Sequence, residues 1–389
     1  MVLLLAALEL GLYHAGDYGK WVVQERDRLL GWKMLPDQQR WSRDLTVPEV
    51  VNSWGFRDRE WERAPTERDA GLFRVVVLGN SMTYGTSVPV EEVWTRVLEE
   101  RLQERLDARG DGRRALVMNL AVQGYVFEQM FRCYLANARE VDAVRWDEDD
   151  PAAPPAIESS PRLRPDLVIV PTLPHDAAPM MPGSDDADYL FRDAVLRSAT
   201  HDMLVDRVID KWIPKPRPAA SAAVARRLAA IAAADRAMQE KPWADANRAH
   251  WARAEARMAE LRDLVEADGG RLLLVNLPVK HPLLHEGAPT TTVRWGPWAA
   301  AQNRLPERPA VVQVEPLEAF RAAMPDLLPL LREGGIVPDE RGGQRLDPGL
   351  PHLDESVFLE SDLGHYSARG HRILAERVCE AVVREGLLD

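Results

Sequence analysis

The chain has 389 residues, 46% of them hydrophobic, and a formal net charge of -12. A chain of this size can bury a large core, and its negative charge argues against nucleic acid or another polyanion as a partner. The two cysteines, Cys133 and Cys379, lie far apart in the sequence. They indicate no disulfide framework and leave the cellular compartment open.

The first twelve residues are strongly apolar, but a helix that spans a bilayer needs about 20 such residues. No basic region precedes them and no cleavage site is evident, which argues against a secretory signal. We expect residues 1–69 to form an N-terminal extension. It contains either the inner part of a membrane anchor, which would associate the protein with a membrane outside the cytoplasm, or an amphipathic helix packed on the domain.

Five apolar runs with the length of buried strands recur through the rest of the chain. They cover residues 72–78, 115–119, 166–171, 271–277 and 310–314. Helical patterns separate most of them, as parallel strands joined by crossover helices require. We therefore predict that the rest of the chain, 70–389, forms one α/β domain. Its core would be a doubly wound, mainly parallel sheet of about five strands with helical insertions.

The longest insertion, 177–268, separates the third and fourth predicted strands. Its second half is rich in alanine, arginine and glutamate and predicts one or two helices, interrupted at Pro242. Part of it would be the crossover helix, and the rest would cap the carboxyl edge of the sheet. A later loop carries Trp295 and Trp298, which either line a pocket or only pin the loop. The acidic, proline-rich stretch 147–165 predicts a surface loop.

The first predicted strand runs directly into a tight turn bounded by Gly79 and Gly85, with Ser81 inside it. Open α/β sheets bind ligands at the carboxyl ends of their strands, and backbone N–H groups there can stabilise negative charge. The turn is consistent with a nucleophilic serine. Similar turns also occur in phosphate-binding loops and ordinary βα connections, and Ser81 can alternatively be a helix N-cap.

Near the other end of the chain, Asp362 and His365 lie three residues apart, before a helix predicted over 367–384. A serine hydroxyl becomes a good nucleophile when a base takes its proton, and the base works better when a third group orients it. Ser81, His365 and Asp362 can supply these roles. The alternative is that Asp362 and Ser367 cap the last helix and that His365 is a surface residue.

At these positions the chain resembles the SGNH hydrolases, also called the GDSL family of esterases and lipases. Four blocks carry the resemblance: residues 79–85, 119–125, 166–176 and 362–365. The resemblance implies a flavodoxin-like strand order, which would place Ser81 beside the topological switch point. Gly124 matches the family's oxyanion-hole glycine, and it can also be a turn glycine that needs a positive φ.

Two departures from the family pattern concern the candidate site. Asn80 replaces the acidic residue beside the nucleophile, keeping a hydrogen-bond acceptor but not the charge. His175 stands at the position of the asparagine that donates to the oxyanion, and an imidazole N–H can also donate. It can instead be a loop histidine held by a backbone carbonyl. Asp176 is expected to be a structural acceptor or a cap, and His371 to be exposed.

The resemblance implies an ester hydrolase that works through an acyl-enzyme on O-acetyl or short acyl esters, including esters of carbohydrates. Ser81 would attack, His365 would move the proton and Asp362 would orient His365. The oxyanion would be bound by Ser81, Gly124 and His175. No metal or organic cofactor is expected. Two alternatives stay open: a membrane-associated O-acyltransferase with the same triad, and a catalytically silent glycan-binding or scaffold protein. The sequence leaves the exact ester and the oligomeric state open.

Overall fold

The computed structural model describes residues 24–27, 29–42, 47–61, 71–145, 156–180, 244–285, 311–338 and 344–389, together with 230, 233, 234 and 237. The apolar N-terminal segment, most of residues 181–243 of the long insertion, including Pro242, and the loop with Trp295 and Trp298 lie outside the described residues. The expectations for them therefore stay predictions. None of the helices that the structure describes has both the length and the apolar character of a membrane span.

Five parallel strands form the central sheet, and they occupy the five apolar runs that the sequence predicts. The sheet order is β11-β10-β9-β5-β6, and every neighbouring pair is parallel. The chain moves from β5 to one edge, returns beside β5 and then moves to the other edge. This confirms the doubly wound, flavodoxin-like order. The strands are β5 (Leu72–Val77), β6 (Arg114–Asn119), β9 (Leu167–Thr172), β10 (Arg271–Asn276) and β11 (Val311–Val314).

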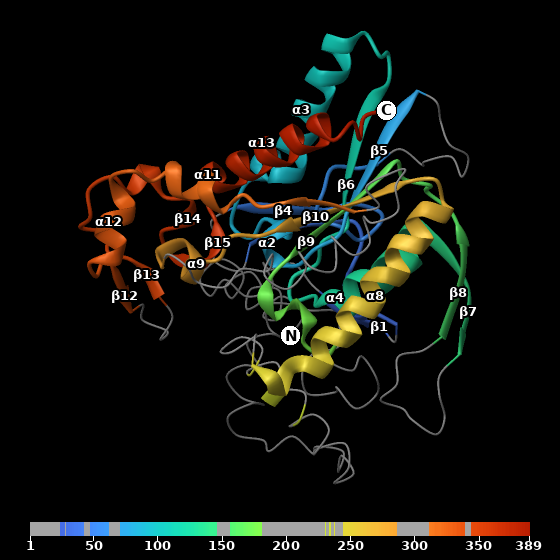
Figure 1. Cartoon of the computed structure of the whole chain (residues 1–389), viewed down its shortest axis with the longest axis horizontal. Coiled ribbons are helices and arrows are strands. Elements are labelled where there is room, and N and C mark those ends of the chain that lie inside the picture. Colours follow the sequence, from blue (N-terminus) through green and yellow to red (C-terminus); the bar gives the residue numbers. More distant parts are fainter. Residues whose placement is uncertain are drawn as a thin grey trace, which may run out of the picture.

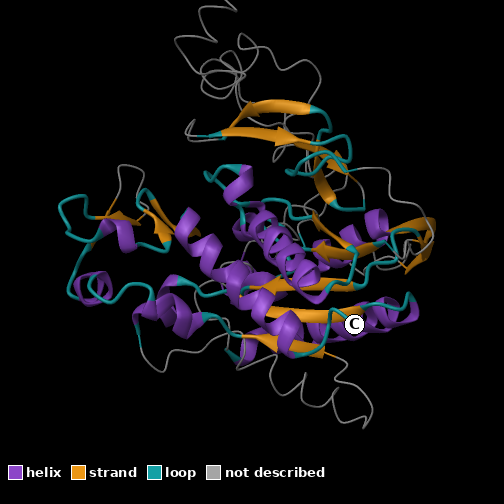
Figure 2. Cartoon of the chain, turned by 90° about the horizontal axis from the view of Figure 1, so that it is seen from above, coloured by secondary structure: helices purple, strands orange, loops and turns teal. Residues whose placement is uncertain are grey.

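Helices cover both faces of this sheet, because successive side chains of a strand point to opposite faces. The neighbours Val75 and Val76 accordingly belong to different hydrophobic clusters. Figure 1 shows α3 and α13 on one side of the sheet and α4 and α8 on the other. Seen from above, helices flank the central strands (Figure 2). These four helices are α3 (Trp94–Arg109), α4 (Phe127–Cys133), α8 (Arg248–Ala267) and α13 (Ala368–Arg384).

Short hairpins and single helical turns complete the described part of the chain. The hairpins are β1 (Gln24–Asp27) with β2 (Gly31–Met34), β3 (Gln38–Trp41) with β4 (Pro48–Val51), β7 (Arg139–Arg145) with β8 (Ala156–Pro161), β12 (Ile336–Pro338) with β13 (Gln344–Leu346), and β14 (Phe358–Leu359) with β15 (Asp362–Tyr366). The short helices are α2 (Ser81–Tyr84), α9 (Lys280–Leu284), α11 (Leu317–Ala322) and α12 (Leu327–Arg332), with helical turns η1 (Val90–Glu92), η2 (Tyr134–Ala138), η3 (Pro174–Ala177), η6 (Asp245–Asn247) and η7 (Leu353–Glu355).

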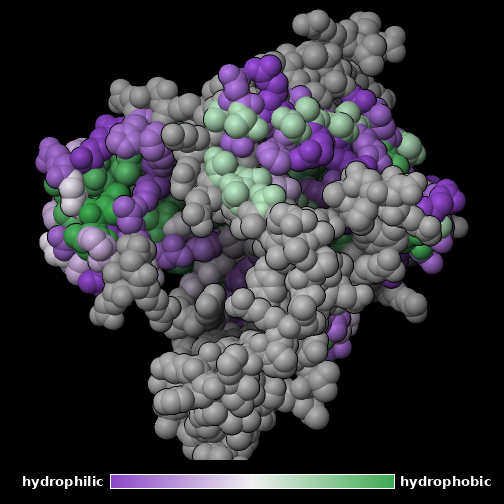
Figure 3. Space-filling view, turned by 90° about the horizontal axis from the view of Figure 1, so that it is seen from below, coloured by the Kyte–Doolittle hydropathy of each residue, from purple (hydrophilic) through white to green (hydrophobic). Residues whose placement is uncertain are grey.

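A lobe beside the sheet is formed by α12 and the hairpins β12–β13 and β14–β15. On the face shown in Figure 3, apolar side chains gather over this lobe. Ile336 and Val337 of β12 are half-buried there, and β13 packs against β15. The lobe therefore supports the strand that carries Asp362 and His365.

The prediction of a surface loop over 147–165 is partly wrong, because much of its second half forms the strand β8, which pairs antiparallel with β7. Arg139 of β7 donates from Nε to Ser159 Oγ at 2.9 Å and forms a buried ion pair with Asp268 beyond α8. Arg139 and Asp268 lie outside the stretch 147–165, so its own composition could not reveal the strand. In the long insertion, α8 is one of the one or two helices predicted over 219–267, and it is the crossover between β9 and β10.

The described part of the N-terminal extension packs against the domain. Leu30, Trp32, Met34, Phe56 and Trp61 are all buried in the hydrophobic cluster that contains α4, α8 and one face of the sheet. The extension thus lies next to the loops that follow β5 and β6.

Candidate active site

Ser81 lies just beyond the carboxyl end of β5, as the first residue of α2. The N-cap of this helix is Asn80, whose Oδ1 accepts the N–H of Met82 at 3.0 Å. Gly79 permits the turn, since a Cβ at this position would lie 2.5 Å from the Cβ of Thr83. The hydroxyl of Ser81 is therefore not a helix cap, and its side chain is half-buried at the carboxyl edge of the sheet, where open α/β sheets commonly bind ligands.

Asp362 and His365 lie together on β15, before α13. His365 Nδ1 is 2.5 Å from Asp362 Oδ2, and Asp362 Oδ1 accepts the N–H of Gly364 at 2.7 Å. The cap of α13 is Ser367, which accepts the N–H of Gly370 at 3.3 Å. The capping alternative for Asp362 is therefore wrong. A carboxylate at Nδ1 favours the tautomer that leaves Nε2 free to accept a proton.

The strand β15 packs against α2, so His365 and Ser81 come from two elements in contact. Among the residues that the structure describes, no hydrogen bond joins Ser81 to His365. Catalytic hydrogen bonds in free enzymes are often long and tighten only when the substrate binds. The arrangement brings the three predicted triad residues to one region of the molecule.

His371 is buried in the structure, so the prediction that it is exposed is wrong. Its Nδ1 accepts the N–H of Trp94 at 3.3 Å, and its ring meets Tyr366 edge-on. Burial is the main cause that lowers the pKa of His371 to about 3, and the charges of Arg57 and His365 act in the same direction. His371 shares the inner face of α13 with Leu374.

Gly124 lies in the loop after β6 and has a φ of +78°, which favours glycine. A Cβ there would lie 3.2 Å from Cζ2 of Trp32. Trp32 also donates its indole N–H to the carbonyl of Gln123 at 3.0 Å, and its own carbonyl accepts the Tyr125 hydroxyl at 2.6 Å. The extension therefore holds the loop in which the sequence predicts an oxyanion donor.

The loop after β6 is also tied to the turn of Ser81. The N–H of Val122 donates to the carbonyl of Gly79 at 3.2 Å. The side-chain amide of Gln123 donates to Thr86 Oγ1 at 3.2 Å, and this hydroxyl donates to the carbonyl of Ser81 at 3.5 Å. Hydrogen bonds thus join the loop after β6, which belongs to the second sequence block, to the Ser81 turn of the first block.

His175 and Asp176 lie in η3, directly after β9. Asp176 is buried, and its two oxygens accept the side-chain amide of Asn80 at 3.0 Å and the N–H of Leu173 at 2.7 Å. Burial raises the pKa of Asp176 to about 6, while His175 and these hydrogen bonds oppose the shift. The side chain of His175 is 38% exposed, with Nε2 at 3.9 Å from Asp176 Oδ1. Asp176 is thus the structural acceptor that the sequence predicts.

The extension also holds the far end of α2, a role that sequence reasoning missed. Arg57 is buried and donates to the carbonyls of Tyr84 at 2.8 Å, Gly85 at 2.9 Å and Val88. The carboxylate of Glu49 accepts the Tyr84 hydroxyl at 2.8 Å and lies 3.6 Å from Arg57 Nε. The acceptors lie 27 to 31 positions further along the chain, so a pattern local to Arg57 does not reveal this role.

One small hollow lies at the carboxyl ends of β9 and β10. Its walls are mostly apolar and include Pro174, Leu277 and Val279, with Glu315 at one side. Pro174 is the residue before His175, and the carbonyl of the lining residue Pro278 accepts the Tyr366 hydroxyl at 2.7 Å. The hollow therefore adjoins both η3 and β15.

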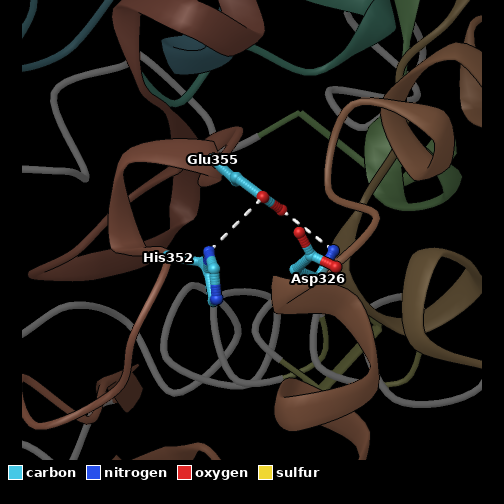
Figure 4. A group of neighbouring side chains, drawn as sticks. All are labelled: Asp326, His352 and Glu355. Carbon is cyan, nitrogen blue, oxygen red and sulfur yellow. Dashed lines mark hydrogen bonds and ion pairs between the residues drawn. The ribbon is translucent and has the colours of Figure 1, made fainter.

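A second cluster of polar side chains lies between α12 and η7 (Figure 4). The ligand atoms of Asp326, His352 and Glu355 lie within 4.8 Å of one another. Glu355 Oε2 accepts the N–H groups of Asp326 and Leu327, each at 3.1 Å, and so caps α12. His352 Nδ1 lies 3.8 Å from Glu355 Oε1. Since Glu355 already has this structural role, the cluster needs no metal to explain it.

Comparison with known proteins gives matches among solved structures, whereas no family model and no curated protein matches the chain. The chain is similar to a lipolytic protein of the G-D-S-L family from Desulfitobacterium hafniense, the lipase Lip_vut3 from a goat rumen metagenome and the acetyl xylan esterase AlAXEase. Sequence identity is 11% in each case. The matches cover 79% of this chain and 99%, 97% and 99% of those chains, with TM-scores of 0.34, 0.34 and 0.35. The solved structures that this chain matches thus include members of the family that its four sequence blocks resemble.

Proposed function

We propose that the protein is a serine-dependent carboxylic ester hydrolase that works through an acyl-enzyme. The observation that carries this proposal is the hydrogen-bonded pair Asp362–His365 on β15, packed against the helix that begins at Ser81. An oriented imidazole next to a half-buried serine is the arrangement that activates a hydroxyl. The family resemblance of the surrounding blocks supports the same chemistry.

In the proposed reaction, Ser81 Oγ attacks the ester carbonyl and His365 Nε2 takes the hydroxyl proton. Asp362 stabilises the imidazolium through Nδ1. The negative charge on the carbonyl oxygen is bound by the N–H groups of Ser81 and Gly124 and by the imidazole of His175. His365 returns the proton to the leaving alcohol, and a water molecule then releases the acid from Ser81 by the same steps.

We infer that the acyl group is an acetyl or another short chain, carried on a small alcohol or a carbohydrate. The small hollow beside η3 supports a short acyl chain, since the side chains of Leu277 and Val279 in its walls can contact an acyl group. The presence of an acetyl xylan esterase among the structures similar to this chain is consistent with such a substrate.

The decisive test is labelling with a fluorophosphonate probe, together with hydrolysis of a short aryl ester. The wild-type protein should be labelled stoichiometrically, and Ser81→Ala should lose labelling and about 10⁴-fold or more of its turnover. Ser160→Ala, on the exposed hairpin β7–β8, is the matched control and should behave as the wild type.

A Ser81→Ala protein with wild-type turnover would contradict the nucleophile assignment. A folded wild-type protein that takes no label would instead favour a silent binding module. Analysis of the products with an acceptor glycan present separates hydrolysis from acyl transfer, because transfer places the acyl group on the glycan and hydrolysis releases the free acid.

A further inference from the structure

The buried hydrogen bond between Asn80 and Asp176 joins two parts of the candidate site. Asn80 precedes the proposed nucleophile Ser81, and Asp176 follows the proposed oxyanion donor His175. The two side chains are 3% and 2% exposed, and they meet across the neighbouring strands β5 and β9. A shift in this contact would therefore move both reacting groups relative to each other.

Every polar atom of the pair has a partner. Asn80 Oδ1 accepts the N–H of Met82 at 3.0 Å, and its Nδ2 donates to Asp176 Oδ1 at 3.0 Å. Asp176 Oδ2 accepts the N–H of Leu173 at 2.7 Å. The backbone N–H groups of Met82 and Leu173 thus each require an acceptor from the pair. The contact between the two side chains requires one donor and one acceptor. One amide and one carboxylate satisfy this pattern.

We propose that Asn80 and Asp176 are a matched pair of positioning residues, which hold the Ser81 turn and the His175 turn in the spacing needed for ester hydrolysis. This inference rests on the proposed function. A misplacement of about 1 Å at a reacting group can cost about 100-fold in rate, so a buried link of this kind acts on turnover and not only on folding.

The pattern of donors and acceptors predicts what each substitution does. Asn80→Asp places two carboxylates against each other in a buried site, which costs energy unless they share a proton. Asp176→Asn places two amides together, so one of them must give up its backbone donor or the contact between them. The reciprocal swap, Asn80→Asp with Asp176→Asn, restores all three hydrogen bonds with the middle one reversed.

The experiment measures kcat and KM for a short aryl ester, and the melting temperature, for the wild type, both single variants and the swap. We expect each single variant to lose about 10-fold or more in kcat with little change in KM. The swap should recover most of this loss. Asn137→Asp is the matched control, because its amide donates to the Cys133 carbonyl on the η2 turn, and it should leave kcat unchanged.

Asn80→Ser provides a variant that keeps a good N-cap acceptor for Met82 but loses the bond to Asp176. It should remain folded and lose kcat. Wild-type kcat in Asn80→Ser, or a folded swap no better than the single variants, would overturn the positioning pair. A wild-type protein that takes no fluorophosphonate label would overturn the proposed function itself, and the pair with it.

Discussion

The contribution of the His175 side chain to the proposed reaction can be measured directly from the kcat of two variants. Its side chain is 38% exposed at the carboxyl edge of the sheet. His175→Asn should preserve or increase ester hydrolysis, because the amide supplies an N–H of the kind that the family uses. His175→Ala should lower kcat about 100-fold, the scale for losing one oxyanion donor. Steady-state kinetics of the two variants gives both numbers.

Circular dichroism of both variants provides the control for folding. If folded His175→Ala keeps the wild-type kcat, the imidazole does not bind the oxyanion. The donors would then be backbone groups, such as those of Ser81 and Gly124.

The buried carboxyl of Asp176 makes the stability of the protein depend on pH. Burial raises its pKa from 3.8 to about 6, so the folded protein holds this proton more tightly than the unfolded chain does. The contribution of Asp176 to the free energy of unfolding is therefore fully present below about pH 4, where the carboxyl is protonated in both states. It is lost as the pH rises through about 6. The rise in the pKa of Asp176 from 3.8 to about 6 corresponds to about 3 kcal/mol of unfolding free energy. Asp176→Asn lacks this dependence.

Urea unfolding of the wild type and of Asp176→Asn between pH 4 and 7.5 measures the effect. The difference in unfolding free energy should move in favour of the variant by up to about 3 kcal/mol over this range. His175 faces Asp176, so the same comparison in a His175→Gln background removes the neighbouring titratable group. A difference that stays constant with pH would show that Asp176 is ionised throughout.

At the residue scale, the sequence predicts the groups whose spacing is local and misses those whose partners are distant. The pairing of Asp362 with His365 could be predicted because the two residues lie three positions apart. The structure joins them by a hydrogen bond. The bond between Asn80 and Asp176 spans 96 positions, so no local pattern reveals it. The prediction for His371 is wrong because its burial depends on Trp94, which is distant in the sequence, and on Tyr366.

At the scale of elements, the central strands were predictable because strands buried on both faces form continuous apolar runs. The strand β8 was not, because it lies in a peripheral hairpin stabilised by Arg139 and Asp268. The helix α2 was also not distinguished from the turn before it. Four residues are too few to show a periodic pattern, and the ends of α2 are held by Asn80 and Arg57.

Arg57 is expected to be essential for the stability of the α2 region. Arg57→Met removes the donors to three carbonyls and the guanidinium that lies 3.6 Å from the buried carboxylate of Glu49. We expect a loss of about 3–5 kcal/mol in the free energy of unfolding, the scale for removing one partner of a buried ion pair. Urea unfolding monitored by circular dichroism measures the loss.

The matched control is Arg101→Met, because Arg101 pairs with Glu104 on the exposed side of α3. It should change the unfolding free energy by less than about 1 kcal/mol. Adding Glu49→Gln to Arg57→Met should recover part of the loss, since it removes the buried negative charge that the Arg57 guanidinium faces in the wild type. Equal losses in the two arginine variants would mean that the buried contacts of Arg57 contribute little.

At the scale of the whole molecule, the extension and the sheet share one core. Trp32, Met34, Phe56 and Trp61 are each buried against the face that carries α4 and α8. Each large apolar side chain contributes about 1.5–3 kcal/mol when fully buried, so the group is comparable to the net stability of a typical domain. A chain that begins at residue 71 should therefore fail to unfold cooperatively and should expose apolar surface.

Thermal unfolding and binding of a hydrophobic dye, compared with the full chain, test this expectation. A chain from residue 71 that unfolds cooperatively at the same temperature as the full chain would show that the sheet and its remaining helices suffice. In that case the extension would affect only the loops around Ser81 and Gly124.

The ribosome makes the chain from its N-terminus, so residues that contact each other in the folded protein are synthesised at different times. Phe56 and Trp61 are synthesised before α4, so they cannot be buried against it until that helix has also been made. Ser81 is made 284 positions before His365, which takes roughly 15 to 60 seconds at about 5–20 residues per second. During that interval the proposed nucleophile is an ordinary serine. In the proposed mechanism, the nascent protein therefore gains its reactivity only after His365 has been made.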